Sequence, residues 1–183
     1  MPVTVYRVGN LSCDSKSGNF QRNIDSNAFY RMLKAMLLLR RAPRVEWQVD
    51  ITPIDYAGEA VAALALQDQA VGRMFHICNP VQISYEDMIG KFREYGYYIS
   101  MMEWAEYEAW LLDTRQPKDQ KGVELAMAQL EGDGAKNSNY RYSCPQTLEF
   151  LTGTDVSCAK LDSSFFTRLI DHAVEVGYFD KPN

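Results

Sequence analysis

The sequence predicts an α/β fold whose first half alternates strands with helices and whose second half is mostly helical. A short β-branched run near the N-terminus is followed, after a polar loop, by an amphipathic segment that begins at a capping residue. Two further short apolar runs each lead into a segment with helical spacing. Hydrophobic residues make up 46% of the 183 residues and charged residues 23%, which is ordinary for a globular domain.

The first half of the chain contains three expected strands and three expected helices. Val3–Val8 is rich in β-branched residues and predicts a buried strand, followed by a polar loop over residues 9–25. Ser26 or Asn27 can cap a helix that runs to about Leu39. The other elements expected here are strands over Trp47–Thr52 and Arg73–Asn79, a helix over Tyr56–Leu66 capped by Asp55, and a helix over Tyr85–Tyr95 capped by Ser84 and ended by Gly96.

The second half has helical spacing with little strand character. Residues 116–121 are polar and predict a solvated break, and residues 131–139 predict a polar loop. The elements expected here are a strand over Tyr97–Met102, helices over Ala105–Asp113, Val123–Leu130, Gln146–Leu151 and Phe165–Val176, an extended segment over Tyr140–Ser143, and a helix stop at Gly177.

Charge argues against a nucleic-acid-binding protein. The formal net charge is −5 and the sequence pI is about 5.1, without a basic stripe. The densest basic cluster is Arg40, Arg41 and Arg44, at the end of an expected helix. Cations are favoured at that end by the helix dipole, and this interpretation is preferred over a binding patch.

Cysteine spacing and the N-terminus indicate a cytoplasmic protein. The four cysteines stand at 13, 78, 144 and 158 and form no CxxC pair, which argues against a disulfide framework or a zinc site. The N-terminus has no signal-peptide pattern, and no apolar run approaches the roughly 18 residues of a membrane span.

Familiar catalytic motifs are absent from the sequence. It has no GxGxxG, no P-loop and no GxSxG. His76 and Cys78 are expected to share a strand face, and we interpret them as a core histidine beside a buried thiol. Tyr30 and Lys34 have the Tyr-x-x-x-Lys spacing of the proton-donor pair of short-chain dehydrogenases, but ordinary helix spacing is the preferred interpretation.

A second candidate for acid–base chemistry is a group of carboxylates. Glu103, Glu106 and Glu108 lie around Trp104 and Tyr107. Paired acids can serve as general acid and base. An exposed helix face beside an aromatic anchor is the simpler interpretation, and we prefer it.

Several stretches together resemble one known family. "VTVYRVGNLSCDSKSGNFQRNIDSNAFYRMLKAML" has a strand, Arg-x-Gly-Asn, a Ser- and Gly-bearing loop and an Asn-bearing helix. It is similar to the middle of a terminal thioester reductase domain of a nonribosomal peptide synthetase. "DITPIDYAGEAVAALAL", "MFHICNPVQISYEDMI", "EYGYYISMMEWAEYEAWL" and "CAKLDSSFFTRLIDHAVEVGYF" resemble the segments that follow in that family.

The resemblance implies a fold and an activity. Such domains belong to the extended short-chain dehydrogenase/reductase superfamily and use NADPH to reduce a carrier-bound peptidyl or acyl thioester to an aldehyde or an alcohol. The fold expected is the end portion of a Rossmann-like parallel sheet, residues 1–80, plus a mostly helical C-terminal substrate-binding lobe, residues 81–183, together forming one compact unit.

The resemblance does not include the nucleotide-binding half of the family. The glycine-rich loop and the catalytic residues would lie before Met1, so no catalytic residue and no metal site is expected in this chain. We expect NADPH to bind the complete domain and this chain alone to be inactive.

The resemblance also assigns site residues at the end of the first strand. The backbone of Val8 and Gly9 would lie against the nicotinamide, and Asn10, Leu11 and Ser12 would border the substrate carbonyl or the phosphopantetheine arm. Cys13 stands where the family motif usually has glycine, which puts the geometry of this loop in question.

In the helical lobe, the resemblance implies a channel for the acyl chain. Met101, Trp104 and Tyr107 are expected to bind the substrate, with Met102 and Trp110 adding adaptable apolar surface. Packing between helices is the competing interpretation for each of them.

Partners follow from the same resemblance. They are the upstream nucleotide-binding half and a peptidyl carrier domain with its phosphopantetheine-linked substrate, without nucleic acid or membrane. A homodimer paired through the Val3–Val8 edge is also predicted. One alternative is a non-catalytic carrier-protein-binding or interaction module that uses Arg40, Arg41 and Arg44. Another is the corresponding lobe of a nucleotide-sugar epimerase, which would need several cations to hold a diphosphate.

Overall fold

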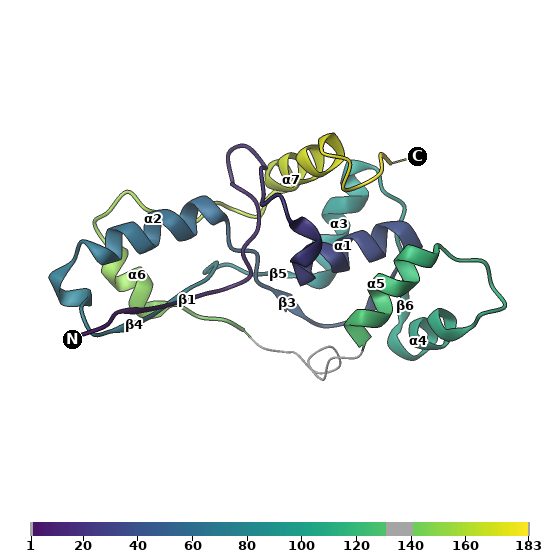
Figure 1. Cartoon of the computed structure of the whole chain (residues 1–183), viewed down its shortest axis with the longest axis horizontal. Helices are drawn as coiled ribbons and strands as arrows, with labels where there is room; N and C mark the ends of the chain where they lie inside the picture. Colours follow the sequence, from purple (N-terminus) through teal and green to yellow (C-terminus); the bar gives the residue numbers. More distant parts are fainter. Residues whose placement is uncertain (1, 131–140, 183) are drawn as a thin grey trace. The chain divides into compact units, whose positions relative to one another are not determined.

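The computed structural model describes residues 2–130 and 141–182, and Figure 1 shows its helices and strands. The contacts divide the chain into two compact units. Unit 1 contains Met1–Phe20, Gln48–Ile83 and Arg141–His172, and unit 2 contains Gln21–Trp47, Ser84–Tyr140 and Ala173–Asn183. The sequence predicts one part before residue 80 and one after it, whereas each of these units combines three separate segments of the chain. The interleaving arises because parallel strands need long crossovers, so each unit is assembled from distant segments.

Unit 1 is built on two parallel strands. β1 (Val5–Val8) pairs with β4 (Met74–Ile77), with Val5 opposite Met74 and Val8 opposite Ile77. Helices α2 (Ile54–Ala65) and α6 (Pro145–Leu151) pack on one another, and α6 also packs on β4. The buried residues of this core are Tyr56, Ala57, Ala60, Leu64, Ala70, Phe75, Ile77 and Leu151.

Asp55 has a different role from the helix cap that the sequence predicts. The N-cap of α2 is Pro53, and Asp55 lies in the first turn of the helix. Its carboxylate accepts hydrogen bonds from the Ser15 amide at 2.9 Å and the Ser15 hydroxyl at 2.6 Å. Proline fits this position because its fixed φ suits the start of a helix, and Asp55 is then free to hold the loop that follows β1.

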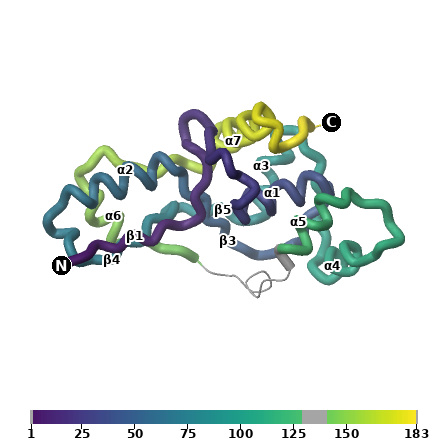
Figure 2. Tube along the Cα trace, in the orientation of Figure 1, coloured from purple at the N-terminus to yellow at the C-terminus, as the bar shows by residue number. Residues whose placement is uncertain are grey.

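Unit 2 is mostly helical. α1 (Ala28–Leu39) begins at Asn27, whose side chain accepts hydrogen bonds from two backbone amides of the first turn, which confirms the predicted cap. α1 packs along α5 (Gln120–Leu130), as the tube in Figure 2 shows. The buried residues of this core are Ala35, Leu39, Tyr107, Leu111, Leu125 and Ala126.

The helix end at Arg40–Arg44 was expected, but a strand there was not. Arg41–Arg44 form β2, which pairs in parallel with β6 (Ser100–Glu103). The Arg44 guanidinium lies 3.0 Å from the Glu103 carboxylate, and the Arg41 guanidinium lies 4.5 Å from the centre of the Trp110 ring. Two cations of the predicted basic cluster therefore have partners within unit 2.

The remaining elements largely follow the local signals. α3 (Tyr85–Tyr95) begins at Ser84, whose hydroxyl accepts the Asp87 amide at 3.0 Å, and it ends at Gly96 with φ 123°. α4 (Trp104–Leu112) and α7 (Ser163–Glu175) lie where helices were expected. The expected strand over Trp47–Thr52 is reduced to β3 (Gln48–Val49), which pairs with β5 (Ile83–Ser84). The loop expected over residues 131–139 lies outside the described residues.

His76 is exposed, so its interpretation as a core histidine is wrong. Phe75 and Ile77 of β4 are buried, while Met74 and His76 point to the exposed face. Cys78 follows the end of the strand and is buried, so it does not share a face with His76. The expected spacing rule failed because the two-residue alternation of a strand stops where the strand stops.

Among the described helices, none has the length and the run of apolar residues needed to span a membrane.

The loop between β1 and α1 depends on a glycine. Gly18 has φ 77°, and a Cβ there would lie 2.1 Å from the backbone oxygen of Arg168. We expect Gly18→Ala to lower the free energy of unfolding by about 2–4 kcal/mol, because alanine disfavours this positive φ and its Cβ would clash with the backbone of Arg168. Urea denaturation of the chain measures this. Gly58→Ala, in α2 where a Cβ meets no atom within 4 Å, is the control and should gain about 0.5–1 kcal/mol. Equal stability of Gly18→Ala and the parent chain would contradict the assignment.

Candidate functional site

The segment that follows β1 continues as an ordered backbone ladder. The Gly9 amide donates to the Ile77 oxygen at 2.8 Å, which extends the pairing of β1 with β4. Leu11 then forms a parallel bridge with Thr52, and the Ser12 amide donates to the Thr52 oxygen at 2.8 Å. The predicted site segment is therefore held on both sides by backbone hydrogen bonds within unit 1.

A buried carboxylate joins the ends of the two strands. Asp50 is 1% exposed. One of its oxygens accepts the Asn10 amide at 2.9 Å, and the other accepts the Asn79 amide at 3.1 Å and the Thr52 hydroxyl at 2.9 Å. Asn10 follows β1 and Asn79 follows β4, so a single side chain fixes the carboxyl ends of both strands. Charge-assisted hydrogen bonds of this kind are among the stronger ones in proteins.

Asn79 completes this network. Its side-chain amide donates to the Ile51 oxygen at 2.9 Å, and its side-chain oxygen accepts the Val81 amide at 2.9 Å. Its backbone amide is shared between Asp50 and the Thr52 hydroxyl, which lies 3.0 Å away. The network of buried polar groups is thus well satisfied, which favours one rigid arrangement of the strand ends.

Sequence reasoning did not single out Asp50. The available signal was an aspartate between two apolar residues, Val49 and Ile51, in a segment that reads as a buried strand. A charged residue at such a position is expected to be paired or hydrogen-bonded, because an isolated buried charge is costly.

Gly9 is required by packing against Asp50. A Cβ at Gly9 would lie 1.9 Å from one carboxylate oxygen of Asp50 and 3.1 Å from the Thr52 hydroxyl oxygen. Gly9 is not among the described residues with positive φ, so the need for glycine is steric rather than conformational. The close approach expected at this glycine is therefore made, within the chain, by a carboxylate.

The other predicted residues of this segment differ in exposure. Val8 and Asn10 are exposed and Leu11 is half-buried, whereas Ser12 is 4% exposed. The Ser12 hydroxyl has no hydrogen-bond partner among the residues that the structure describes. A buried hydroxyl without a partner is unfavourable by about 1–3 kcal/mol.

Cys13 fits the loop in place of the glycine of the family motif. The only described non-glycine residue with positive φ is Arg40, so Cys13 has an ordinary backbone conformation. Its side chain is fully buried, and burial raises the pKa of the thiol to about 12. The thiol is therefore protonated at neutral pH and packs as a small apolar group.

Unit 2 brings two of the predicted substrate-binding residues together. Trp104 and Tyr107 line an aromatic pocket of about 60 Å³, with Trp47 lying 6.2 Å from Trp104 between ring centres. Tyr107 is buried, and burial raises the pKa of its phenol to about 12. Met101 lies in β6 opposite Ala42 and does not line the pocket. The remaining lining residues are Met32, Ala35, Met36, Arg41, Ala42, Pro43, Tyr85 and Ala126.

Tyr30 and Lys34 pack on a third residue. Tyr30 is 1% exposed, and its ring lies 6.4 Å from that of Tyr178 in an edge-on arrangement. The Lys34 ammonium lies 4.2 Å from the centre of the same Tyr178 ring. These contacts agree with the interpretation of the pair as ordinary helix packing.

One member of the acidic group around α4 forms an ion pair. Glu103 pairs with Arg44, and Glu106 is exposed on the surface of α4. Among the described residues, His, Cys, Asp and Glu side chains form no group of three or more that could hold a metal ion.

Comparisons of the sequence identify several similar proteins. No protein-family model matches the chain. The chain is 24% identical over 182 residues to a linear gramicidin synthase of Brevibacillus parabrevis, covering 97% of this chain and 4% of that protein. It is 31% identical over 180 residues to glycine betaine reductase of Emericella nidulans, covering 96% of this chain and 12% of that protein.

Comparisons of the fold agree with those of the sequence. The terminal R domain from the myxalamid PKS–NRPS biosynthetic pathway matches 100% of this chain and 46% of its own, with a TM-score of 0.88 and 25% identity. A thiolation–reductase di-domain from an archaeal non-ribosomal peptide synthetase matches 98% of this chain and 37% of its own, with a TM-score of 0.78 and 25% identity. The chain therefore spans less than half of each solved structure.

The matches confirm the mixed α/β fold, and they extend from the first strand to the last helix of the chain. In fold and sequence the chain is therefore similar to a portion of the terminal reductase domains of nonribosomal peptide synthetases.

Proposed function

We propose that this chain is the substrate-binding portion of an NADPH-dependent thioester reductase that releases a carrier-bound peptidyl or acyl thioester as an aldehyde or an alcohol. The observation that carries the proposal is the ordered strand end, Gly9–Ser12, fixed by buried Asp50 within a fold that matches terminal reductase domains over its whole length. A rigid backbone segment at the carboxyl end of parallel strands is where α/β folds of this kind bind ligands.

The residues present suit a cofactor and a carbonyl at this strand end. When bound to the complete domain, NADPH supplies the hydride that reduces the thioester, and the carrier thiol leaves. Val8 and Gly9 would present backbone to the nicotinamide. The exposed Asn10 and the half-buried Leu11 would border the thioester, and the unpartnered hydroxyl of Ser12 would donate a hydrogen bond to its carbonyl oxygen.

The aromatic pocket of unit 2 suits the apolar part of a substrate. Its walls are provided by Trp47, Tyr85, Trp104 and Tyr107, together with the flexible side chains of Met32 and Met36. Methionine and aromatic side chains adapt to apolar groups of different shape. In this proposal Trp104 and Tyr107 bind the acyl or peptidyl chain, and Met101 supports β6 from outside the pocket.

The exposed surface of the strand pair supports an upstream nucleotide-binding half as a partner. Val3, Val5, Val8 and Met74 expose between 40% and 60% of their side chains. Parallel strands are normally covered on both faces, so this apolar surface suits further strands of a Rossmann-type sheet. In the chain alone, the same edge would pair with a second copy, and light scattering would then detect a homodimer.

A carrier domain is the second proposed partner. One matching structure joins a thiolation domain to a reductase domain in a single protein.

The proposed location of the reaction is the cytoplasm. A reducing compartment keeps thiols free, and Cys13, Cys78, Cys144 and Cys158 are all free thiols. The alternative of a non-catalytic carrier-binding module would rely on Arg40 alone, since Arg41 and Arg44 already have partners.

The test compares two proteins in one assay. The first is the 183-residue chain, and the second is the same chain preceded by a nucleotide-binding half from a related reductase domain. With an acyl-phosphopantetheine thioester as substrate, we expect NADPH oxidation and aldehyde formation only in the second. Ser12→Ala in the second protein should lower kcat by about tenfold or more. Turnover by the short chain, or no effect of Ser12→Ala, would reject the assigned roles.

A further inference from the structure

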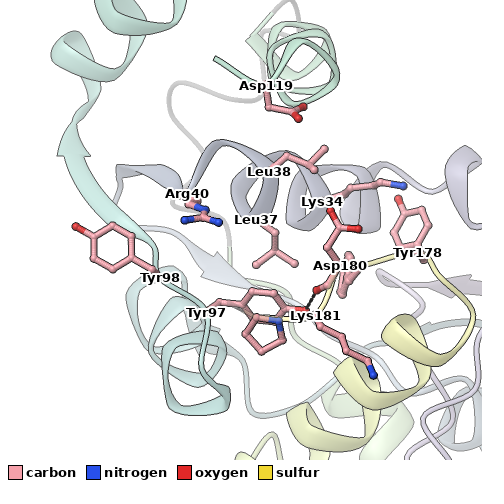
Figure 3. A pocket seen from close by; sticks show the side chains of 12 residues that line it. Lys34, Leu37, Leu38, Arg40, Tyr97, Tyr98, Asp119, Tyr178, Asp180 and Lys181 are labelled. Atoms are coloured by element: carbon pink, nitrogen blue, oxygen red, sulfur yellow. Dashed lines mark hydrogen bonds between the residues drawn. The ribbon is translucent and has the colours of Figure 1, made fainter. Parts of the chain in front are cut away.

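Unit 2 contains another cavity that shares no lining residue with the aromatic pocket. Its volume is about 340 Å³, within the range of small-molecule sites. Figure 3 shows Arg40, Leu37 and Tyr97 around it, with Lys34, Asp180 and Tyr178 along one side. The lining comes from the end of α1, the segment after α3, the residue before α5 and the segment after α7, so the cavity lies wholly within one unit.

The cations around this cavity are not neutralised by acidic partners. Among the described residues, the side chains of Lys34, Arg40 and Lys181 form no ion pair or hydrogen bond, and the Lys34 ammonium lies over the face of Tyr178. Two carboxylates, those of Asp119 and Asp180, also line the cavity. Asp119 accepts the Gly122 amide at 2.7 Å at the start of α5. Three cations face two carboxylates on this lining, so its formal charge stays positive, by one unit.

The backbone at Arg40 is the unusual feature of the site. Arg40 is the one described non-glycine residue with positive φ, at 52°, and it forms the left-handed cap of α1. Glycine or asparagine is the common choice at such a cap, and a long side chain there is unfavourable by about 1 kcal/mol or more. The sequence nevertheless keeps an arginine, and its guanidinium faces the cavity.

The aromatic walls complete the site. Tyr178 lies beneath the Lys34 ammonium, and burial raises the pKa of its phenol to about 12, so the ring is neutral at physiological pH. The Tyr97 hydroxyl donates to the backbone oxygen of Asp180 at 2.6 Å, which fixes the rim. Flat apolar walls beside unpaired cations suit a ligand that has both a ring and a negative charge.

We propose that this cavity binds a small anion with an aromatic or apolar body, its carboxylate or phosphate group held by Arg40 with Lys34 and Lys181, and its ring against Leu37 and Tyr97. The site is separate from the residues assigned to thioester reduction and does not depend on that assignment. A guanidinium holds either head group through two parallel hydrogen bonds, so the shared chemistry is that of a planar or tetrahedral oxyanion.

The experiment uses the 183-residue chain and three probes. Naphthyl phosphate and naphthoate carry the two head groups, and naphthol is the uncharged comparison; binding is followed by the fluorescence of the probe. We expect at least one anion to bind ten times or more tightly than naphthol, with an affinity that falls as salt rises. The stronger of the two anions then identifies the head group.

Two variants decide where binding occurs. Arg40→Gly removes the cation and keeps the left-handed cap, because glycine favours that conformation, and it should weaken anion binding tenfold or more. Arg44→Gln is the control, since Arg44 pairs with Glu103 outside the cavity, and it should change the affinity less than twofold. Equal binding of naphthol and the anions, or unchanged affinity in Arg40→Gly, would overturn the proposal.

Discussion

Replacement of Asp50 by alanine is expected to lower the free energy of unfolding by about 3–5 kcal/mol, measured by urea denaturation of the 183-residue chain. The variant leaves the amide of Asn79 without its charged acceptor in a buried site, and the amide of Asn10 loses its acceptor as well. The Thr52 hydroxyl loses its acceptor too, although its oxygen still accepts the Asn79 amide.

Two further variants separate this network from a general effect of removing aspartate. Asp68→Ala, at an exposed position in the short turn after α2, should change stability by less than about 0.5 kcal/mol. Asp50→Asn keeps one acceptor oxygen, but its side-chain NH2 group would face another hydrogen-bond donor. Its free energy of unfolding should therefore lie between those of the parent chain and Asp50→Ala. If Asp50→Ala and Asp68→Ala were equally stable, the carboxylate would not hold the strand ends.

The helices that were predicted from the sequence depend on contacts within a few residues. Asn27 caps α1 through amides two and three residues away, and Ser84 caps α3 in the same way. Gly177 has φ 70° just after α7, as the stop signal predicted. Such signals are legible in a sequence because the groups that satisfy one another are neighbours along the chain.

The strands and the site depend on contacts between distant residues, which local patterns do not reveal. Asp50 joins Asn10, 40 residues away, and Asn79, 29 residues away. β2 is a strand because β6 supplies its hydrogen bonds, although Arg41–Arg44 contains a proline and two arginines. A proline is acceptable at the edge of a sheet, so tertiary pairing overrides the local preference.

The candidate site was accessible from the sequence only in outline. The family resemblance predicted Gly9–Ser12 as site residues, but it gave no reason to choose Asp50 as the residue that fixes this segment. Trp104 and Tyr107 gather at the aromatic pocket because α4 presents them on one face, three residues apart. Met101 precedes α4 and lies in β6. Side chains alternate between the two faces of a strand, whereas in a helix they repeat about every 3.6 residues, so Met101 does not share the face of Trp104 and Tyr107.

Gly9→Ala is expected to lower the free energy of unfolding by about 2–4 kcal/mol, because its new methyl group would lie 1.9 Å from an Asp50 carboxylate oxygen and clash with it. Gly90→Ala is the control, since a Cβ at this position in α3 meets no atom within 4 Å. In the complete reductase that carries the added nucleotide-binding half, we expect Gly9→Ala to reduce NADPH-dependent thioester turnover by about tenfold or more, because the strand end must shift.

A double-mutant cycle tests whether Asp50 is the cause. In the Asp50→Ala background the carboxylate oxygen is gone, so the added methyl group of Gly9→Ala has space and its cost should fall by about 1 kcal/mol or more. Strictly additive effects would mean that Gly9 is required for another reason, such as the 3.1 Å approach to the Thr52 hydroxyl. If the two effects are not additive, Gly9 and the buried carboxylate of Asp50, 41 residues apart in the sequence, together set the position of the strand end that the proposed reductase uses.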